Sequence, residues 1–364
     1  MPPCPAQLAV GLCCALSLLG CNEASGPRAL ESGTKPSDPP STRAVSTRRP
    51  LVHFEGACDA SGAVPLDERR FAVADDEDSV LRIYDAERGG PPLYTVDVSG
   101  GLDVAKKPEK AKKKAKRPPK RRKVAETDIE AATVIGQRAY WITSHARTKS
   151  GKRDPARFKF FATELPRRQG PQQPIGLPYT ALVDDMLADP RLAALGLAKA
   201  AEHPPAAGGL NIEGMTATPE GKLLLGLRQP VHQGKAVVLT LDNPDGVLRG
   251  DHARFGPPTL LDLGGLGVRA LSWWRGNYLV VAGARGADLG SRLYRWDGAA
   301  RPAELPEVRF DDLNPEGFFT PEARDTILIL SDDGTKPVGG EPCKELENPE
   351  HKRFRGLWLD LGRR

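Results

Sequence analysis

A short pattern recurs five times along this chain: a polar or acidic residue, an apolar strand, a turn rich in Gly, Pro or charge, and a second apolar strand. Three of the starts are nearly identical, namely Asp128-Ile129-Glu130-Ala131, Asn211-Ile212-Glu213-Gly214 and Asn314-Pro315-Glu316-Gly317. Repeated units of short strands indicate a radial β architecture in which each repeat is one sheet. A carboxylate at the start of each repeat would bring several acids to one place.

The repeats predict an all-β fold, a β-propeller of five four-stranded blades. Between residues 211 and 263, four short strands alternate with turn sequences such as Pro-Glu-Gly and Asn-Pro-Asp-Gly, which is the length of one blade. The other blades are expected at about 57–98, 129–165, 268–308 and 317–361. Residues 51–54 are an orphan strand that would complete the last blade, so that pairing between the two ends of the chain closes the ring.

The segment 170–205 decides between five and six blades. Six is the alternative if this segment hides a degenerate repeat. Its leucine and alanine spacing instead predicts a short helical insertion at 180–202, which Pro190 divides into two helices.

The first 50 residues differ in composition from the rest. Residues 5–20 carry no charge and are mostly apolar, which is typical of a signal peptide. They end in Leu18-Leu19-Gly20-Cys21, which resembles the lipobox of bacterial lipoproteins and implies lipidation of Cys21. We therefore expect a signal peptide at 1–20, a lipid-anchored disordered tether at 21–50 and the propeller at 51–364, in the bacterial cell envelope on its periplasmic or extracellular face. An uncleaved anchor or a wrongly assigned start is the alternative.

The net charge of +5 comes from one Lys-rich insertion and not from the rest of the chain. The run 106–123 holds twelve basic residues and one acid, so everything outside it is net acidic. We expect a disordered Lys-rich insertion at 105–125 that is either a solvated loop or a contact for anionic lipid or polyanions. Nucleic acid is not an expected partner of an exported protein, and we expect a monomer bound to the membrane through its lipid.

Cys58 and Cys343 are the cysteines that remain beside Cys21 after removal of a signal peptide. Exported proteins meet an oxidising compartment, so this pair invites a disulfide. Two separate buried thiols are the alternative.

The topology of a propeller converts sequence positions into a site, because the start of each first strand and the end of each second strand share one rim. Aligning the repeats places Asp59, Glu130, Glu213, Arg269 and Glu316 at equivalent starts. The ends of the second strands add Asp75, Asp76, His145, Arg228, Asp332 and Asp333, and together these are the predicted ligand-binding residues. Arginine has no obvious role in a repeated structural carboxylate, so Arg269 favours a ligand site.

Two interpretations of these carboxylates stay open. Oxygen ligands from several loops suit Ca²⁺, with Glu130, Glu213 and Glu316 as candidate ligands, and Arg228 and Arg269 could then hold a phosphate or carboxylate. Alternatively, each carboxylate caps the backbone amides of a neighbouring turn. The first interpretation predicts an envelope protein that binds a metal ion, a small anion or both.

A Ca²⁺-dependent hydrolase of phosphate or carboxylic esters is the second functional hypothesis, so enzymatic activity is left open. Its candidate catalytic residues are Glu130, Glu213 and His145. The sequence has no Gly-x-Ser-x-Gly elbow, Walker loop, dinucleotide fingerprint or zinc spacing.

Several motifs together resemble a bacterial family known as domain of unknown function 3616. They are Cys58-Asp59-Ala60-Ser61-Gly62, Ala74-Asp75-Asp76-Glu77-Asp78, Asp128-Ile129-Glu130, Ser144-His145, Asn211-Ile212-Glu213-Gly214-Met215, the stretch 261–269 and Ser331-Asp332-Asp333-Gly334. The resemblance spans about residues 51–361 and implies no activity. More distantly, the Glu-Gly strand starts resemble the phytase-like and esterase-like propellers, some of which bind calcium and hydrolyse phosphate esters; the phytases have six blades.

Overall fold

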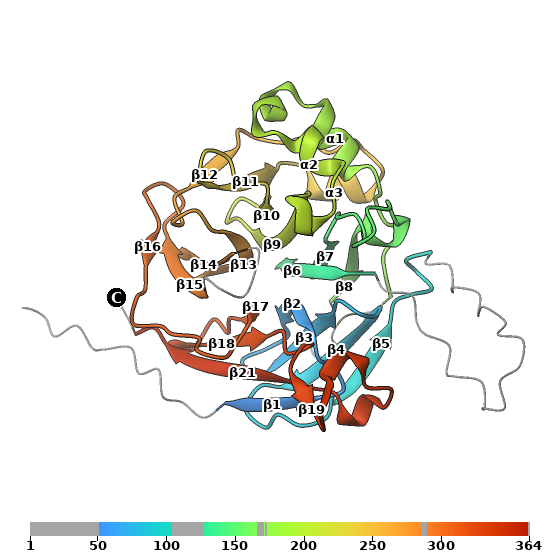
Figure 1. Ribbon diagram of the computed structural model, residues 1–364, viewed down its shortest axis with the longest axis vertical. Coiled ribbons are helices and arrows are strands. Elements are labelled where there is room, and N and C mark those ends of the chain that lie inside the picture. Colours follow the sequence, from blue (N-terminus) through green and yellow to red (C-terminus); the bar gives the residue numbers. More distant parts are fainter. Residues whose placement is uncertain (1–50, 104–126, 166–170, 172, 285–289, 363–364) are drawn as a thin grey trace, which may run out of the picture. The chain divides into compact units, whose positions relative to one another are not determined.

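The computed structural model describes residues 51–103, 127–165, 171, 173–284 and 290–362, which belong to one compact unit. The expected signal peptide, the tether with Cys21 and the Lys-rich insertion 105–125 lie outside the described residues. Within the described part, five antiparallel sheets surround a central axis (Figure 1). The predicted five-bladed propeller is therefore confirmed.

Three blades follow the simple order of four consecutive strands. One consists of β2 (Ala60–Pro65), β3 (Arg70–Asp75), β4 (Val80–Asp85) and β5 (Tyr94–Asp97). Another consists of β9 (Asn211–Ala217), β10 (Leu223–Gln229), β11 (Ala236–Leu241) and β12 (Thr259–Leu261). The third consists of β13 (Gly267–Trp274), β14 (Asn277–Gly283), β15 (Ser291–Trp296) and β16 (Ala303–Glu304).

The last blade closes the ring. It has the order β17 (Pro315–Phe319), β18 (Thr326–Ser331), β21 (Arg353–Asp360) and β1 (Val52–Glu55). β1 pairs antiparallel with β21, so the N-terminal strand completes the C-terminal blade as the sequence predicts. Between β18 and β21 the chain forms a small hairpin of β19 (Pro337–Val338) and β20 (Glu341–Pro342), followed by short 3₁₀ turns at Cys343–Glu345 and Pro349–His351.

The remaining blade departs from four full strands. It holds β6 (Ile129–Ile135), β7 (Arg138–Thr143) and β8 (Phe160–Glu164) as a three-stranded sheet. Isolated bridges from Phe160 to Tyr179 and from Thr163 to Pro174 occupy the place of the fourth strand. A proline has no N–H to donate to a ladder, which is one reason why this edge is irregular.

The helical insertion follows that edge. It comprises α1 (Leu182–Ala188), a 3₁₀ helix (Pro190–Leu195), α2 (Leu197–Ala201) and a 3₁₀ turn (Pro205–Ala207). Pro190 begins the 3₁₀ helix, and Asp189 caps it by accepting a hydrogen bond from the Arg191 N–H. The segment 170–205 is thus no sixth blade. None of the described helices is long and apolar enough to span a membrane.

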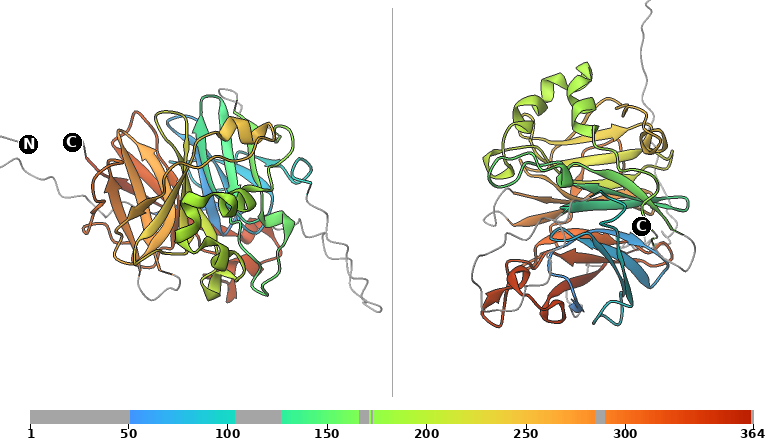
Figure 2. Two further views of the ribbon diagram at one scale, coloured as in Figure 1. Left: turned by 90° about the horizontal axis from the view of Figure 1, so that it is seen from above. Right: turned by 90° about the vertical axis from the view of Figure 1, so that its right-hand side faces the viewer.

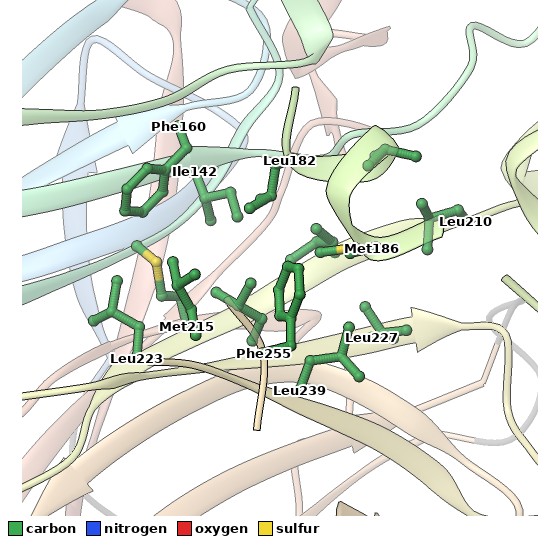
Figure 3. Close-up of a cluster of buried hydrophobic side chains, with 14 of the residues drawn as sticks. Ile142, Phe160, Leu182, Met186, Leu210, Met215, Leu223, Leu227, Leu239 and Phe255 are labelled. Carbon is green, nitrogen blue, oxygen red and sulfur yellow. The ribbon is translucent and has the colours of Figure 1, made fainter. Parts of the chain in front are cut away.

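Apolar layers between neighbouring blades hold the ring together. A buried cluster lies between the β6–β8 and β9–β12 blades and includes Leu182 and Met186 of α1 (Figure 3). Figure 2 shows the helices from two further directions, outside the β9–β12 blade. Four comparable clusters fill the other blade interfaces. Each fully buried Leu or Phe contributes about 1.5–3 kcal/mol, so these layers fix the first strands around the axis.

Candidate functional site

A β-bulge interrupts the start of each first strand. In β6 the pairing passes from Ile129–Thr143 to Ala131–Ile142 and leaves Glu130 as the extra residue. The same shift isolates Glu213 in β9, Arg269 in β13 and Glu316 in β17. A bulge re-aims a side chain that regular pleating would send elsewhere, so four charged residues gather at one rim of the axis.

Asp59 does not occupy the position expected from the sequence. In β2 the pairing passes from Ala60–Asp75 to Ala63–Val73, which places Ser61 at the level of Glu130. Asp59 lies two residues earlier, at the level of Asp128, and its backbone forms an isolated bridge with Asp332. The expected alignment of Asp59 with the glutamates is therefore wrong by two residues, because the bulge in this blade spans the small pair Ser61-Gly62.

The rim encloses a cavity of about 1040 Å³. Its described lining includes Asp76, Glu130, Glu213, Arg269 and Asp332. Below this level the space between the first strands falls to about 20 Å³. The reason is close backbone contact: a Cβ at Gly62 would lie 2.6 Å from the carbonyl carbon of Ala131. The site is a cup with a narrow floor.

One half of the cup is a cluster of carboxylates. Asp76, Asp128 and Glu130 each offer an oxygen within 4.8 Å of the others, and so do Asp59, Asp76 and Glu77. Burial, followed by the charges of Asp59 and Glu130, raises the pKa of Asp76 well above its usual value. Burial, followed by the charge of Asp128, does the same to the pKa of Glu130. Burial, followed by the charges of Asp332 and Asp75, raises the pKa of Asp59 to about 9.

Two cations border this acidic half. Lys344 places Nζ 3.5 Å from Oε1 of Glu77, and Arg157 forms an ion pair with Asp128. Asp59 is only 3% exposed, and its Oδ2 has no hydrogen-bond partner among the described residues. A buried carboxylate oxygen without a partner is unfavourable unless a cation or a proton compensates it.

The other half of the cup holds arginines that already have partners. Arg228 Nη1 donates to Glu213 Oε1 at 2.6 Å. Arg269 forms an ion pair with Glu316, donates to Asn314 Oδ1 at 2.7 Å and lies 3.8 Å from Glu213 Oε2. Arg269 thus separates two carboxylates of neighbouring blades, so its presence has a structural reason that the sequence analysis did not foresee.

The structure does not unite the three candidate metal ligands. Glu130 joins Asp76 and Asp128, whereas Glu213 and Glu316 belong to neither of the carboxylate groups found in the described part of the chain. Glu213 and Glu316 already pair with Arg228 and Arg269, although Nε of each arginine has no hydrogen-bond partner among the described residues.

Three other predicted residues bind neighbouring backbone or side-chain groups. Asp75 accepts hydrogen bonds from the N–H groups of Cys58 at 3.0 Å and Glu77 at 2.9 Å. Asp333 pairs with Arg355 at 2.7 Å. Asp332 lines the cavity, but its oxygens accept from Asn314 Nδ2 and the Gly334 N–H, both at 2.8 Å. The alternative that carboxylates cap turns thus holds for Asp75 and Asp332, whereas Asp333 is bound by side chains.

His145 lies outside the described lining of the cavity. Its ring is buried against Phe158, and Nδ1 lies 2.8 Å from the carbonyl oxygen of Thr143, so it donates in the neutral ring. Burial lowers the pKa of His145 to about 4, so the imidazole is neutral at physiological pH. This placement gives no support to a role as general base.

Cys58 and Cys343 form the disulfide that the sequence suggested, with a sulfur–sulfur distance of 1.97 Å across 285 residues. Asp59 and Lys344 follow the two cysteines directly, so the bridge brings them close together, and Lys344 lines the cavity. Lys344 was not predicted, because it becomes part of the site only through this long-range link. Asp128, Asn211 and Asn314 were also missed, although they stand two residues before the three glutamates of the repeated motif.

A family model described as "Protein of unknown function (DUF3616)" matches residues 105–317, which is more than half of the chain. The chain belongs to this family. The match confirms the resemblance seen in the sequence motifs, over a shorter range than expected. No curated protein matches the sequence.

Solved structures resemble the DUF3616 chain in fold alone. A PQQ-bound aldose sugar dehydrogenase from Streptomyces coelicolor is 12% identical, with 86% of this chain and 99% of that chain covered and a TM-score of 0.39. Glutaminyl cyclase from Myxococcus xanthus is 12% identical, with 88% and 97% covered and a TM-score of 0.42. Similarity at this level carries no argument about activity.

Proposed function

We propose that this protein binds a divalent cation such as Ca²⁺ in the cup, with Asp76, Asp128 and Glu130 as ligands. The observation that carries the proposal is that three carboxylate oxygens, one from each residue, lie within 4.8 Å of one another. Ca²⁺ binds oxygens at about 2.3–2.6 Å, so ligands on opposite sides of one ion are about 5 Å apart. The oxygen-only donor set favours a hard cation over zinc or copper.

Two buried polar oxygens in the lining of the cup also support a cation. Oδ1 of Asp76 is buried and makes no hydrogen bond to any residue that the structure describes. Asn211 lines the cavity, is 5% exposed, and leaves Oδ1 without a described hydrogen-bond partner while its Nδ2 donates to Glu213. Such oxygens are acceptors without donors, which is the arrangement a cation would satisfy.

A cation is favoured over a small anion because of how the charges are paired. Arg228 and Arg269 are paired with glutamates, whereas the carboxylate cluster has more acids than the cations that pair with it. Like charges this close cannot all ionise alone, and a bound cation would replace the protons that the raised pKa values retain.

Export to the bacterial envelope remains part of the proposal. It rests on the lipobox-like Cys21 and the uncharged stretch before it, and the Cys58–Cys343 disulfide supports an oxidising compartment. We further propose that the lipid anchors the protein to the membrane and that the 106–123 run contacts anionic lipid. A hydrolase is less well supported, because His145 does not reach the cavity.

Thermal unfolding of chelator-treated protein tests the cation site. Ca²⁺ at 100 times its dissociation constant should stabilise the wild type by about 2.7 kcal/mol and raise its melting temperature. Asp76→Asn should lose most of this rise, because it removes a charge from the cluster. Without Ca²⁺ the same variant should be at least as stable as the wild type, since one like charge is gone.

Glu307→Gln is the matched control, because Glu307 is exposed and lies outside the described lining of the cavity. It should retain the full Ca²⁺ response. The proposal fails if millimolar Ca²⁺ leaves the melting temperature of the wild type unchanged, or if Asp76→Asn responds as strongly as the control.

A further inference from the structure

We propose that the cup holds two divalent cations rather than one, and that the carboxylate of Asp76 bridges them. This inference rests on the proposed cation site and extends it. The first ion would bind Asp76, Asp128 and Glu130, and the second would bind Asp59, Asp76 and Glu77. Asp76 belongs to both groups, and in each group the ligand oxygens lie within 4.8 Å of one another.

Asp59 supplies an independent reason for the second ion. It is 3% exposed, and Oδ2 finds no hydrogen-bond donor in the described part of the chain. An ion bound by Asp76, Asp128 and Glu130 would leave this oxygen unsatisfied, because Asp59 is not in that group. An ion in the second group would satisfy it.

The turn at Gly334 holds the Asp59 carboxylate in its place. A Cβ at Gly334 would lie 1.6 Å from Asp59 Oδ1, so the turn backbone packs directly against the carboxylate. The Gly334 N–H is already bonded to Asp332 Oδ1, so this turn does not supply the missing donor to Asp59. The carboxylate is therefore positioned by packing.

The local excess of carboxylates is compatible with more than one divalent ion. The two groups together hold the carboxylates of Asp59, Asp76, Glu77, Asp128 and Glu130, and the carboxylate of Asp332 lies close to that of Asp59. Lys344 and Arg157 are the described cations that pair with members of the two groups, so the carboxylates here outnumber the cations that pair with them. Glu213 and Glu316 do not change this balance, because Arg228 and Arg269 neutralise them.

A carboxylate that bridges two ions sets them about 3.5–4 Å apart, a spacing that many two-metal centres share. Both ions would face the open part of the cup, since Asp76, Glu77, Asp128 and Glu130 all line the cavity. The ligand class is a pair of hard divalent cations, as the oxygen-only donor set dictates.

Metal stoichiometry tests the inference. Full-length protein with its disulfide intact is stripped with chelator, dialysed against saturating Ca²⁺, and analysed by mass spectrometry for calcium per chain. The wild type should bind two ions, and Glu77→Gln and Glu130→Gln should each bind one, from opposite groups. The exposed control Glu307→Gln should bind two.

The outcomes separate this inference from the proposed function. One ion per wild-type chain would overturn the two-ion centre and leave the single site standing. Two ions in Glu77→Gln would also overturn it, because the second group would then not be the binding site. No bound ion would overturn both proposals, and circular dichroism establishes that each variant is folded.

Discussion

Replacing His145 with asparagine should remove a source of acid instability from the protein. The imidazole is buried, its Nδ1 is engaged by the Thr143 carbonyl, and its Nε2 has no hydrogen-bond partner within the described structure. A proton added to Nε2 would therefore create a buried charge without an acceptor. Asparagine is the appropriate replacement, because the residue has φ of 51°, a left-handed conformation that asparagine tolerates.

The pKa of His145 determines the magnitude and the sign of the effect of pH on the free energy of unfolding. Burial lowers it from 6.5 to about 4 in the folded protein, while the unfolded chain keeps the ordinary value. Between these values the unfolded state binds a proton that the folded state does not, so stability present above pH 6.5 is lost as the pH falls towards 4. At about 1.4 kcal/mol per pH unit, the loss amounts to about 3 kcal/mol.

Urea denaturation of both proteins at a series of pH values between 7.5 and 4 measures this effect. The asparagine variant also loses the ring packing against Phe158, so its stability at neutral pH will be lower by an amount that does not depend on pH. The informative quantity is how the difference in free energy of unfolding between the two proteins changes with pH. Parallel pH profiles would refute the argument, because they would mean that His145 titrates equally in both states.

Two further perturbations probe the walls of the cup. The double variant Cys58→Ala/Cys343→Ala should lower the free energy of unfolding by about 5 kcal/mol in urea denaturation, because the bridge spans 285 residues. Two alkylatable thiols in the unreduced, unfolded wild-type protein would contradict the premise that the disulfide forms. Gly334→Ala should lower the free energy of unfolding by about 1–3 kcal/mol in the same assay, because the new methyl group would displace Asp59. The control Gly100→Ala, whose added Cβ would have no atom within 4 Å, should leave the free energy of unfolding nearly unchanged. Equal effects of the two substitutions would refute the packing argument.

The blade count and ring closure were predictable because both depend on local signals. Turn sequences and alternating apolar runs mark each strand, and the orphan strand at 51–54 had an obvious partner in an incomplete last blade. The outer edge of the β6–β8 blade was harder to predict from the sequence, because isolated bridges at Pro174 and Tyr179 leave little periodicity of apolar residues.

The sequence predicted which charged residues lie at the rim, but not which of them contact one another. The sequence placed Glu130, Glu213 and Glu316 at equivalent strand starts, and the structure agrees on their register and adds a bulge at each of them. Which carboxylates share space depends on loops from different blades, and those distances have no local signature. Asp76 and Asp128 therefore meet Glu130, while Arg269 inserts between the other two glutamates.

Lys344 is a second example of a site residue that the sequence alone could not reveal. It lies in the loop between β18 and β21 and has no counterpart in the other repeats. Only the disulfide and the contact of its Nζ with Glu77 reveal that it belongs to the site. Long-range links of this kind follow from the assembled ring and not from the repeat.

A crystal structure of the protein grown in Ca²⁺, with anomalous scattering measured, tests the cation site most directly. We expect an anomalous peak within about 2.3–2.6 Å of oxygens from Asp76, Asp128 and Glu130. Ordered water among these carboxylates with no anomalous signal, or Ca²⁺ bound in the cup only at positions away from Asp76, Asp128 and Glu130, would contradict the account.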